Sequence, residues 1–248
     1  MKCKNCDTEL DLASEACPSC GRRSLFLETE PGEYRITGSP VGFIHEGPTD
    51  GGDGHFVDHR PASGGRSFSV SDSKGGFTTH LSGTLQVGRE GEWWVMKVLR
   101  KALAKAGQEV ETPTDRSAED DRGEDGLIRV GGQDFILQVV TFPIDEIIWG
   151  ALARGEAELS GDRARALELL RETLRHKNRR MASSERSSVI LVIDGRNVSS
   201  LFSRELVTAY LKKYGAPEKE FGFAQIWLIG PTVWTTIRLD GPDAGTSV

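Results

Sequence analysis

The four cysteines are the residues whose type and spacing most directly indicate chemistry. They occur as two pairs, Cys3 with Cys6 and Cys17 with Cys20, and ten residues separate the pairs. Two thiolates that are two residues apart can bind one ion, and a second such pair completes a tetrahedral four-sulfur zinc site. A pair of disulfides is the alternative, but it requires an oxidising compartment that nothing else in the sequence indicates. The spacing therefore predicts a structural Zn²⁺ site.

The second cysteine pair resembles the second knuckle of a short zinc ribbon. Residues 17–21 read Cys-Pro-Ser-Cys-Gly, and Gly21 permits the positive-φ turn that directs backbone N–H groups at the sulfurs. The resemblance implies a ribbon over residues 1–23 that depends on its metal, since so short a segment cannot form a core. Zinc ribbons bind nucleic acid, dock proteins or serve structure alone. We therefore expect nucleic acid or a partner protein at this end of the chain.

Two charged side chains interrupt the apolar stripes of predicted helices. Glu92 lies near the start of a helix expected over residues 89–106, and Lys177 lies in a helix expected over residues 162–182. Both positions face a neighbouring sheet, where a charge needs a partner. The structural alternatives are a first-turn glutamate favoured by the helix dipole and a lysine that snorkels to water. The stripe that contains Glu92 has the apolar residues Met96, Leu99 and Leu103. The stripe that contains Lys177 has Leu167, Leu170, Leu174 and Met181.

A further pair of polar residues belongs to two consecutive predicted strands. Asp125 ends an acidic loop and opens a strand expected over residues 126–130. Gln138 lies inside a strand expected over residues 134–141, between apolar residues on both faces. A buried amide is costly unless it is hydrogen-bonded or coordinates a cation. A core amide that bonds a neighbouring loop is an equally good interpretation of Gln138.

These residues would be positioned by alternating helices and strands that begin near residue 85. The predicted order is αβββαβ followed by αββ, which favours the α/β class with a mixed sheet and helices on its faces. The expected elements are a helix at 89–106, strands at 108–112, 126–130 and 134–141, helices at 143–157 and 162–182, a strand at 187–194, a helix at 204–214, and strands at 223–229 and 233–239.

This order resembles the core of the PD-(D/E)XK, or restriction-endonuclease-like, superfamily over roughly residues 88–195. The resemblance implies Mg²⁺-dependent hydrolysis of phosphodiester bonds, more in DNA than in RNA. It assigns Mg²⁺ binding to Asp125 and Glu92. It assigns catalytic roles to these two residues together with Gln138 and Lys177.

The departure from the family pattern lies at position 140. The family has a lysine there, two residues after its Glu or Gln, but this chain has Val140. Valine can neither carry a proton nor stabilise an anion, so Lys177 would have to supply the ammonium from the following helix. The rival hypothesis is a catalytically inactive protein of the same fold that acts as a nucleic-acid-binding or scaffolding module. The missing lysine and the glutamine in place of glutamate both favour that rival.

Basic residues gather at the end of the helix that carries Lys177. Arg175, Arg179 and Arg180 form the centre of this stretch, which predicts contacts with a phosphate backbone. The alternative is an ordinary solvated helix end whose positive charge the helix dipole favours.

The overall composition limits the other classes of function. The 248 residues carry a formal charge of −6, which argues against a generally basic nucleic-acid-binding surface but not against a local one. Loop-like, glycine-rich sequence over residues 24–84 predicts a flexible linker with some β structure, including a hairpin at 66–82. The domain is expected over residues 85–240, with a disordered tail at 241–248. Without a membrane-spanning run or a signal-peptide core, the sequence predicts a cytoplasmic protein.

Overall fold

The computed structural model describes residues 35–39, 42–49, 54–61, 64–85, 89–115, 124–201, 204–230 and 236–239. They form two compact units. The first takes its residues from Met1–Gln86 and Glu146–Asp162, and the second from Val87–Asp145 and Arg163–Val248. The zinc ribbon expected over residues 1–23 and the tail expected over residues 241–248 lie outside the described residues, so both stay predictions.

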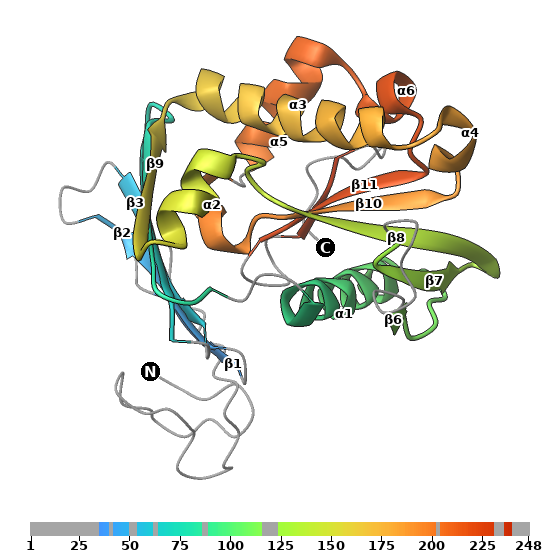
Figure 1. The fold of residues 1–248 in the computed structure, drawn as a ribbon, viewed down its shortest axis with the longest axis horizontal. Helices are drawn as coiled ribbons and strands as arrows, with labels where there is room; N and C mark the ends of the chain where they lie inside the picture. The colour runs from blue at the N-terminus through green and yellow to red at the C-terminus, as the bar shows by residue number, and fades with distance from the viewer. Residues whose placement is uncertain are drawn as a thin grey trace, which may run out of the picture. The chain divides into compact units, whose positions relative to one another are not determined.

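The first unit contains a six-stranded antiparallel sheet in the order β1-β2-β3-β4-β5-β9 (Figure 1). The strands are β1 (Arg35–Ser39), β2 (Gly42–Pro48), β3 (Gly54–Pro61), β4 (Arg66–Asp72), β5 (Phe77–Ser82) and β9 (Glu156–Gly161). The described part of residues 24–84 therefore contains more β structure than the linker with some β structure that the sequence predicts. The glycine-rich sequence forms the turns between these strands, where Gly64, Gly75 and Gly83 have positive φ.

The hairpin predicted over residues 66–82 is confirmed as β4 and β5, which pair in antiparallel register. Its turn is held by Asp72, whose Oδ1 accepts hydrogen bonds from the N–H groups of Lys74 and Gly76, both at 2.8 Å. Alternate residues of β5 are buried, beginning at Phe77 and ending at Leu81. This period of two is the pattern of a strand with one face in a core.

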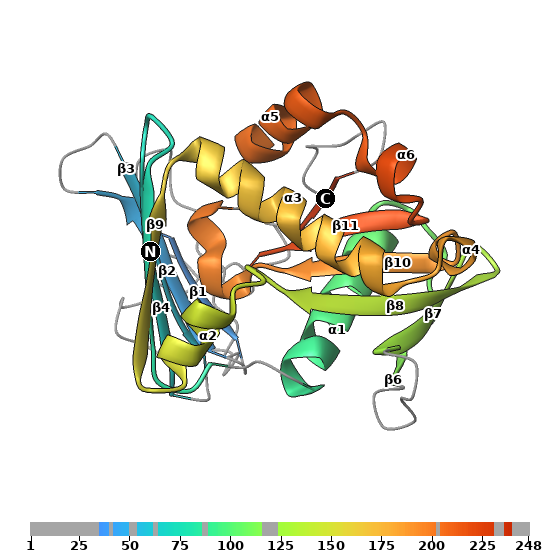
Figure 2. The same cartoon turned by 45° about the horizontal axis from the view of Figure 1, so that its top comes forward.

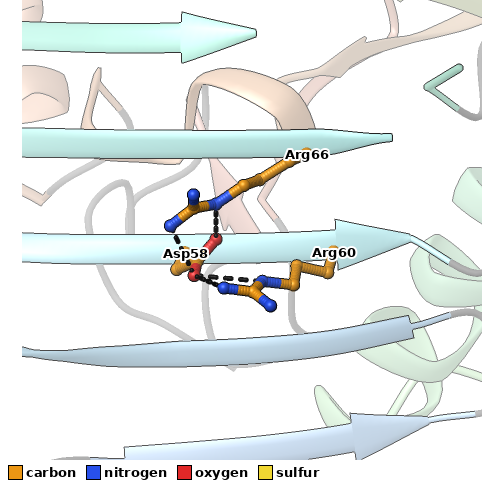
Figure 3. A network of polar contacts seen from close by, with 3 residues as sticks. All are labelled: Asp58, Arg60 and Arg66. Carbon is orange, nitrogen blue, oxygen red and sulfur yellow. Dashed lines mark hydrogen bonds and ion pairs between the residues drawn. The ribbon is translucent and has the colours of Figure 1, made fainter. Parts of the chain in front are cut away.

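A buried carboxylate joins the middle strands of this sheet. Asp58 on β3 accepts hydrogen bonds from Nε and Nη2 of Arg66 on β4, at 2.8 and 3.0 Å (Figure 3). It also accepts them from Nε and Nη2 of Arg60 on its own strand, at 3.2 and 3.0 Å. Burial by itself would raise the pKa of Asp58, but the hydrogen bonds and charges of the two arginines outweigh it and hold that pKa below its usual range.

The helix predicted over residues 143–157 is shorter than expected. Helix α2 covers Glu146–Leu152, and the chain then forms β9, which pairs with β5. Ala157 and Leu159 are buried and alternate with exposed neighbours, which is the pattern of a strand with one buried face. The sequence interpretation missed this strand, which lies at the edge of the sheet. The helix and this strand both belong to the first unit, although they are inserted in the sequence of the second.

The second unit has a mixed six-stranded sheet in the order β12-β11-β10-β8-β7-β6. Strands β8, β10 and β11 are parallel, whereas β6, β7 and β12 join antiparallel at the two sides. The strands are β6 (Thr114–Asp115), β7 (Gly126–Val130), β8 (Gln133–Thr141), β10 (Val189–Asp194), β11 (Gln225–Ile229) and β12 (Thr236–Arg238). The predicted strand at 108–112 is reduced to a single bridge at Val110, and β6 begins after Pro113.

Helices cover both faces of this sheet (Figures 1 and 2). Helix α1 (Arg89–Lys105) packs on one face through a continuous core, and α3 (Arg163–Arg180) lies on the other. The shorter helices are α4 (Ser183–Arg186), α5 (Arg204–Tyr214) and α6 (Pro217–Phe221), and a 3-10 segment covers Arg196–Leu201. The predicted α/β class with a mixed sheet is thus confirmed, and a second, antiparallel sheet adds to it.

Candidate active site

Glu92 is placed by the first turns of α1. The apolar residues of its stripe, Met96, Leu99 and Leu103, are buried in the core between α1 and the sheet, as the helical spacing predicts. Residues four apart lie on one side of a helix, so Glu92 shares the side of Met96. The side chain is only half-buried, because it lies near the end of the helix. A carboxylate at this position combines a partly dehydrated setting with access to solvent.

Asp125 is fixed to strand β8 immediately before β7 begins. Its N–H donates to the carbonyl of Leu137 at 3.1 Å, and its Oδ2 accepts a hydrogen bond from the N–H of Val139 at 2.6 Å. The register pairs Gly126 with Leu137, which places Asp125 beside Gln138. Gln138 is 6% exposed and lies between two β-strand neighbours. The structure therefore brings together the two strand residues that the sequence singled out.

Several charged groups change the pKa of Glu92. Burial raises the pKa of Glu92 above its usual range, and the Asp125 carboxylate raises it further. The Lys177 ammonium lowers it, although Lys177 belongs to α3. Asp115 and Asp194 add smaller increases. The charges of Asp125 and Lys177, which belong to two other parts of the fold, thus both act on Glu92.

Two of these surrounding carboxylates were not among the residues selected from the sequence. Asp115 is the last residue of the short strand β6, and Asp194 is the last residue of β10. Asp194 directly follows a run of buried apolar residues, and a carboxylate at the end of such a strand is a detectable signal. Asp115 lies in polar sequence and carries no such signal.

The donor set is compatible with a hard divalent cation. Mg²⁺ is usually held by one or two carboxylates and keeps several waters. Glu92 and Asp125 provide two carboxylates, and the negative charge of Asp115 also acts on Glu92. In the described part of the chain, no group of three or more His, Cys, Asp or Glu side chains is gathered as a complete metal site. An ion bound by Glu92 and Asp125 would therefore need water for its other ligands.

Strand β8 offers no cation where the PD-(D/E)XK pattern has its lysine. Val140 is buried and pairs with Ile193 of β10. Lys177 is half-buried on α3, between the buried stripe of that helix and its exposed end. It is the ammonium whose charge reaches Glu92.

The arginines near the end of α3 fall into two groups. Arg171 is engaged by Glu220 at 2.8 Å and lies 4.0 Å from the Tyr214 ring centroid, and Arg186 bonds Asn178 and the Phe221 carbonyl. Arg175, Arg179 and Arg180 are exposed and make no hydrogen bond or ion pair with any residue that the structure describes. The three residues predicted to contact nucleic acid are therefore accessible at the carboxyl-terminal part of this helix.

Comparisons with protein-family models, with curated proteins and with solved structures gave no match to this chain. Among the described helices, none has the length and apolar character needed to cross a membrane.

Proposed function

We propose that the second unit is a divalent-metal-dependent nuclease that hydrolyses phosphodiester bonds, with DNA as the favoured substrate. The observation that carries the proposal is that the charges of Asp125 and Lys177 both act on the half-buried Glu92 of α1. Asp125 lies at the start of β7, where the N–H of Val139 holds its carboxylate, and Lys177 lies on α3. Carboxylates that hold a divalent cation and an ammonium that stabilises developing negative charge are the groups that phosphoryl transfer assisted by a cation requires.

The arrangement of elements supports the PD-(D/E)XK-like version of this proposal. In chain order the unit runs from α1 through the antiparallel strands β6, β7 and β8 to α3 and the parallel strand β10. The sheet is flanked by α1 on one face and α3 on the other. Asp125 at the start of the second strand and Gln138 within the third match the family's positions. Fold alone does not establish function, so the proposal depends on the site.

Each residue would have a distinct role. Asp125 and Glu92 would bind Mg²⁺, which supplies Lewis-acid stabilisation of the charge that develops on the phosphate. Gln138 and the backbone carbonyl of Val139 would complete the polar lining next to Asp125. Lys177 would orient the attacking water and stabilise the anionic transition state with its ammonium. The hydrogen bond from Val139 keeps Asp125 in one orientation at this site.

Substrate binding would fall to the exposed end of α3. Arg175, Arg179 and Arg180 lie on the same helix as Lys177 and have no described ion-pair partner. Guanidinium groups bind phosphate oxygens through paired N–H donors. A strand of DNA along this helix end would bring a phosphodiester toward Lys177.

Cleavage by the purified full-length chain tests the proposal. Supercoiled plasmid and labelled oligonucleotides are incubated with Mg²⁺ or Mn²⁺, with EDTA as the negative condition. Asp125→Asn should lose about a hundredfold or more of the rate, because it removes a ligand charge and keeps the volume. Asp134→Asn is the matched control, since this exposed aspartate on β8 forms an ion pair with Arg129 on the neighbouring strand and should retain full activity.

The second candidate function is a binding module without catalysis, and the buried Val140 favours it. This candidate is supported if the wild type cuts no substrate with either cation but still binds DNA. Equal cleavage by wild type and Asp125→Asn would contradict the assignment of the site.

For the amino-terminal segment we propose a structural Zn²⁺ bound by Cys3, Cys6, Cys17 and Cys20. The zinc-bound segment would bind nucleic acid or a partner protein. The spacing of the two cysteine pairs supports the zinc site. Elemental analysis of the purified protein should find one zinc per chain, and Cys17→Ser should release it. Retention of zinc by that variant would contradict the four-cysteine site.

A further inference from the structure

A buried ion pair that the proposed mechanism does not use lies at the carboxyl end of β10. Asp194 and Arg196 are each 3% exposed. Arg196 donates from Nε to Oδ1 of Asp194 at 2.8 Å and from Nη2 to Oδ2 at 2.7 Å. Its backbone N–H donates to the same Oδ1 at 3.2 Å. This forked pairing fixes the plane of the guanidinium.

The guanidinium also contacts a different element. Its Cζ lies 4.9 Å from the centroid of the Trp94 ring, which belongs to α1. Trp94 is two residues after Glu92 and packs against the core of the unit. The ion pair joins the end of β10 to the start of the 3-10 segment that follows it, so it connects no parts of the fold that are distant in the chain. The contact with Trp94 provides that connection.

The position of Trp94 on α1 determines what this contact can restrain. At 3.6 residues per turn, residues two apart point to well-separated sides of a helix. Met96 and Leu99 anchor the side that Glu92 shares, and Trp94 lies on the flank with Val98. A contact on that flank opposes rotation of the helix about its own axis. Such a rotation would swing Glu92 away from Asp125.

A purely stabilising role is a weak explanation for the buried pair. Replacing a buried ion pair with apolar residues is often neutral or stabilising, because both charges must be removed from water. Side chains that support the ligands of a metal site, by contrast, commonly change metal affinity without contacting the ion.

We propose that Arg196 is a positioning residue: held by Asp194, it fixes Trp94 and the first turns of α1, so that Glu92 is presented toward Asp125. The inference rests on the proposed function for the importance of Glu92, but the restraint on α1 is testable without catalysis. Arg196 itself would touch neither the substrate nor the cation.

The chain contains a matched control for the contact. Lys97 on the same helix lies over Trp93, with Nζ 5.0 Å from the ring centroid. Lys97 is exposed and its contact stays within one helix. Lys97→Met therefore removes a cation–π contact of the same kind without releasing α1 from the sheet.

Two measurements on the full-length chain test the proposal. The first is hydrogen exchange of peptides covering residues 89–98 and 189–194. Trp94→Leu leaves the Asp194–Arg196 pair intact and should raise the exchange rate of the α1 peptide several-fold, with the β10 peptide unchanged. Arg196→Met should raise the same exchange rate if the variant folds. Arg196→Lys should give an intermediate rate, because it keeps the charge but loses the forked pairing. The exchange rate of Lys97→Met should match that of the wild type.

The second measurement is Mn²⁺ affinity by titration calorimetry, without substrate. Trp94→Leu should weaken Mn²⁺ binding by about 10- to 100-fold in the wild-type background, the usual effect of losing a group that orients a ligand. In a Glu92→Gln background the same change should have little effect, because Arg196 acts through Glu92. An equal loss in both backgrounds would indicate a general structural role and overturn the proposal.

The two proposals fail in different ways. If the wild type neither binds Mn²⁺ nor cuts DNA, the proposed function fails, while hydrogen exchange still decides whether Arg196 restrains α1. If Trp94→Leu leaves the exchange of residues 89–98 unchanged, the positioning role is wrong even in an active nuclease.

Discussion

Glu92 is a carboxylate in a setting that disfavours its charge. It is half-buried, and the carboxylates of Asp125, Asp115 and Asp194 all act on it in the same direction. Of the named charges, only Lys177 opposes them. Residues that the fold holds at a cost are characteristic of functional sites, because catalysis or binding requires them there.

The raised pKa of Glu92 predicts a specific dependence of stability on pH. A carboxylate whose pKa is higher in the folded state favours folding only while it is protonated. Its contribution is therefore most favourable below the unfolded-state pKa and is lost as pH rises through the folded-state pKa. Glu92→Gln should be more stable than the wild type at neutral pH, and the difference should disappear in acid. Urea unfolding of both proteins in EDTA between about pH 4 and pH 8 measures this difference in unfolding free energy.

A stability difference that stayed constant across that range would contradict the assignment. Glu111→Gln on the same unit is the control, because Glu111 is exposed. Its effect on the unfolding free energy should be small at every pH, as for most surface substitutions.

Lys177 is the residue on which the catalytic proposal depends most directly, since Val140 replaces the usual lysine. Lys177→Met keeps the apolar stem and removes the ammonium. The rate of DNA cleavage should fall about a hundred- to a thousandfold, the typical loss for one group that stabilises transition-state charge. The unfolding free energy should hold or increase, because a partly buried ammonium is costly. Lys212→Met on α5 is the control and should retain full activity. Unchanged cleavage by Lys177→Met would remove this residue from the mechanism.

At the scale of elements, the helices and strands with a strongly periodic apolar pattern were predictable from the sequence. The inserted strand β9 and the short strand β6 were not. The helical stripes of α1 and α3 and the buried strands β8 and β10 each carry many apolar residues at one spacing. These patterns can be recognised in the sequence because each element buries one continuous face. The two-residue strand β6 has no periodicity to detect, and Asp115 went unselected with it.

The antiparallel sheet of the first unit was underestimated for a different reason. Its strands are rich in Ser, Thr, His and Gly, and polar residues such as Ser69 and Thr79 are buried and bonded to each other at 2.9 Å. A strand whose inward face is partly polar lacks the apolar alternation that identifies strands. Strand β9 completes the sheet from a distant segment, and single-sequence patterns carry no information on that pairing.

The Asp58 cluster predicts how this sheet responds to mutation and pH. Asp58→Asn should lower the stability of the β3–β4 region by about 1–3 kcal/mol, since it weakens charge-assisted hydrogen bonds to a buried group. Because the pKa of Asp58 is lowered in the folded state, its contribution is present above the unfolded-state pKa and is lost as pH falls through the folded-state value. Hydrogen exchange of residues 54–72 at neutral and acidic pH measures both effects.

The companion substitution Arg60→Met should change little. Arg60 is mostly exposed, and Arg66 still provides two hydrogen bonds to Asp58 from the neighbouring strand. Exposed ion pairs usually contribute less than about 1 kcal/mol. If Arg60→Met were as damaging as Asp58→Asn, the connection between strands through Arg66 would not be the main contribution of the cluster.

At the scale of the whole molecule, charge is distributed unevenly. The chain carries −6 in total, yet the last turn of α3 contains Lys177, Arg179 and Arg180. Nucleic-acid affinity depends on the cations that touch phosphates, and not on net charge. An acidic protein that contacts DNA through the end of α3 should therefore bind it through few phosphates and release it readily in salt.

That expectation can be measured as a salt dependence. Each lost contact to a phosphate of duplex DNA should reduce the slope of log K against log salt by about 0.9. Changing Arg175, Arg179 and Arg180 together to Gln should weaken binding and flatten the slope accordingly. Fluorescence anisotropy with a labelled duplex in EDTA, on the Asp125→Asn protein, separates binding from cleavage.

A charge-matched variant completes the test, because removing three positive charges anywhere makes an acidic protein more acidic. Arg100, Lys101 and Lys105 are exposed on α1, and changing all three to Gln produces the same net charge. If long-range attraction alone held the DNA, both triple variants would weaken binding equally and neither would change the slope selectively. A loss confined to the α3 variant would instead place the phosphate contacts at the helix that carries Lys177, which is where the proposed cleavage requires them.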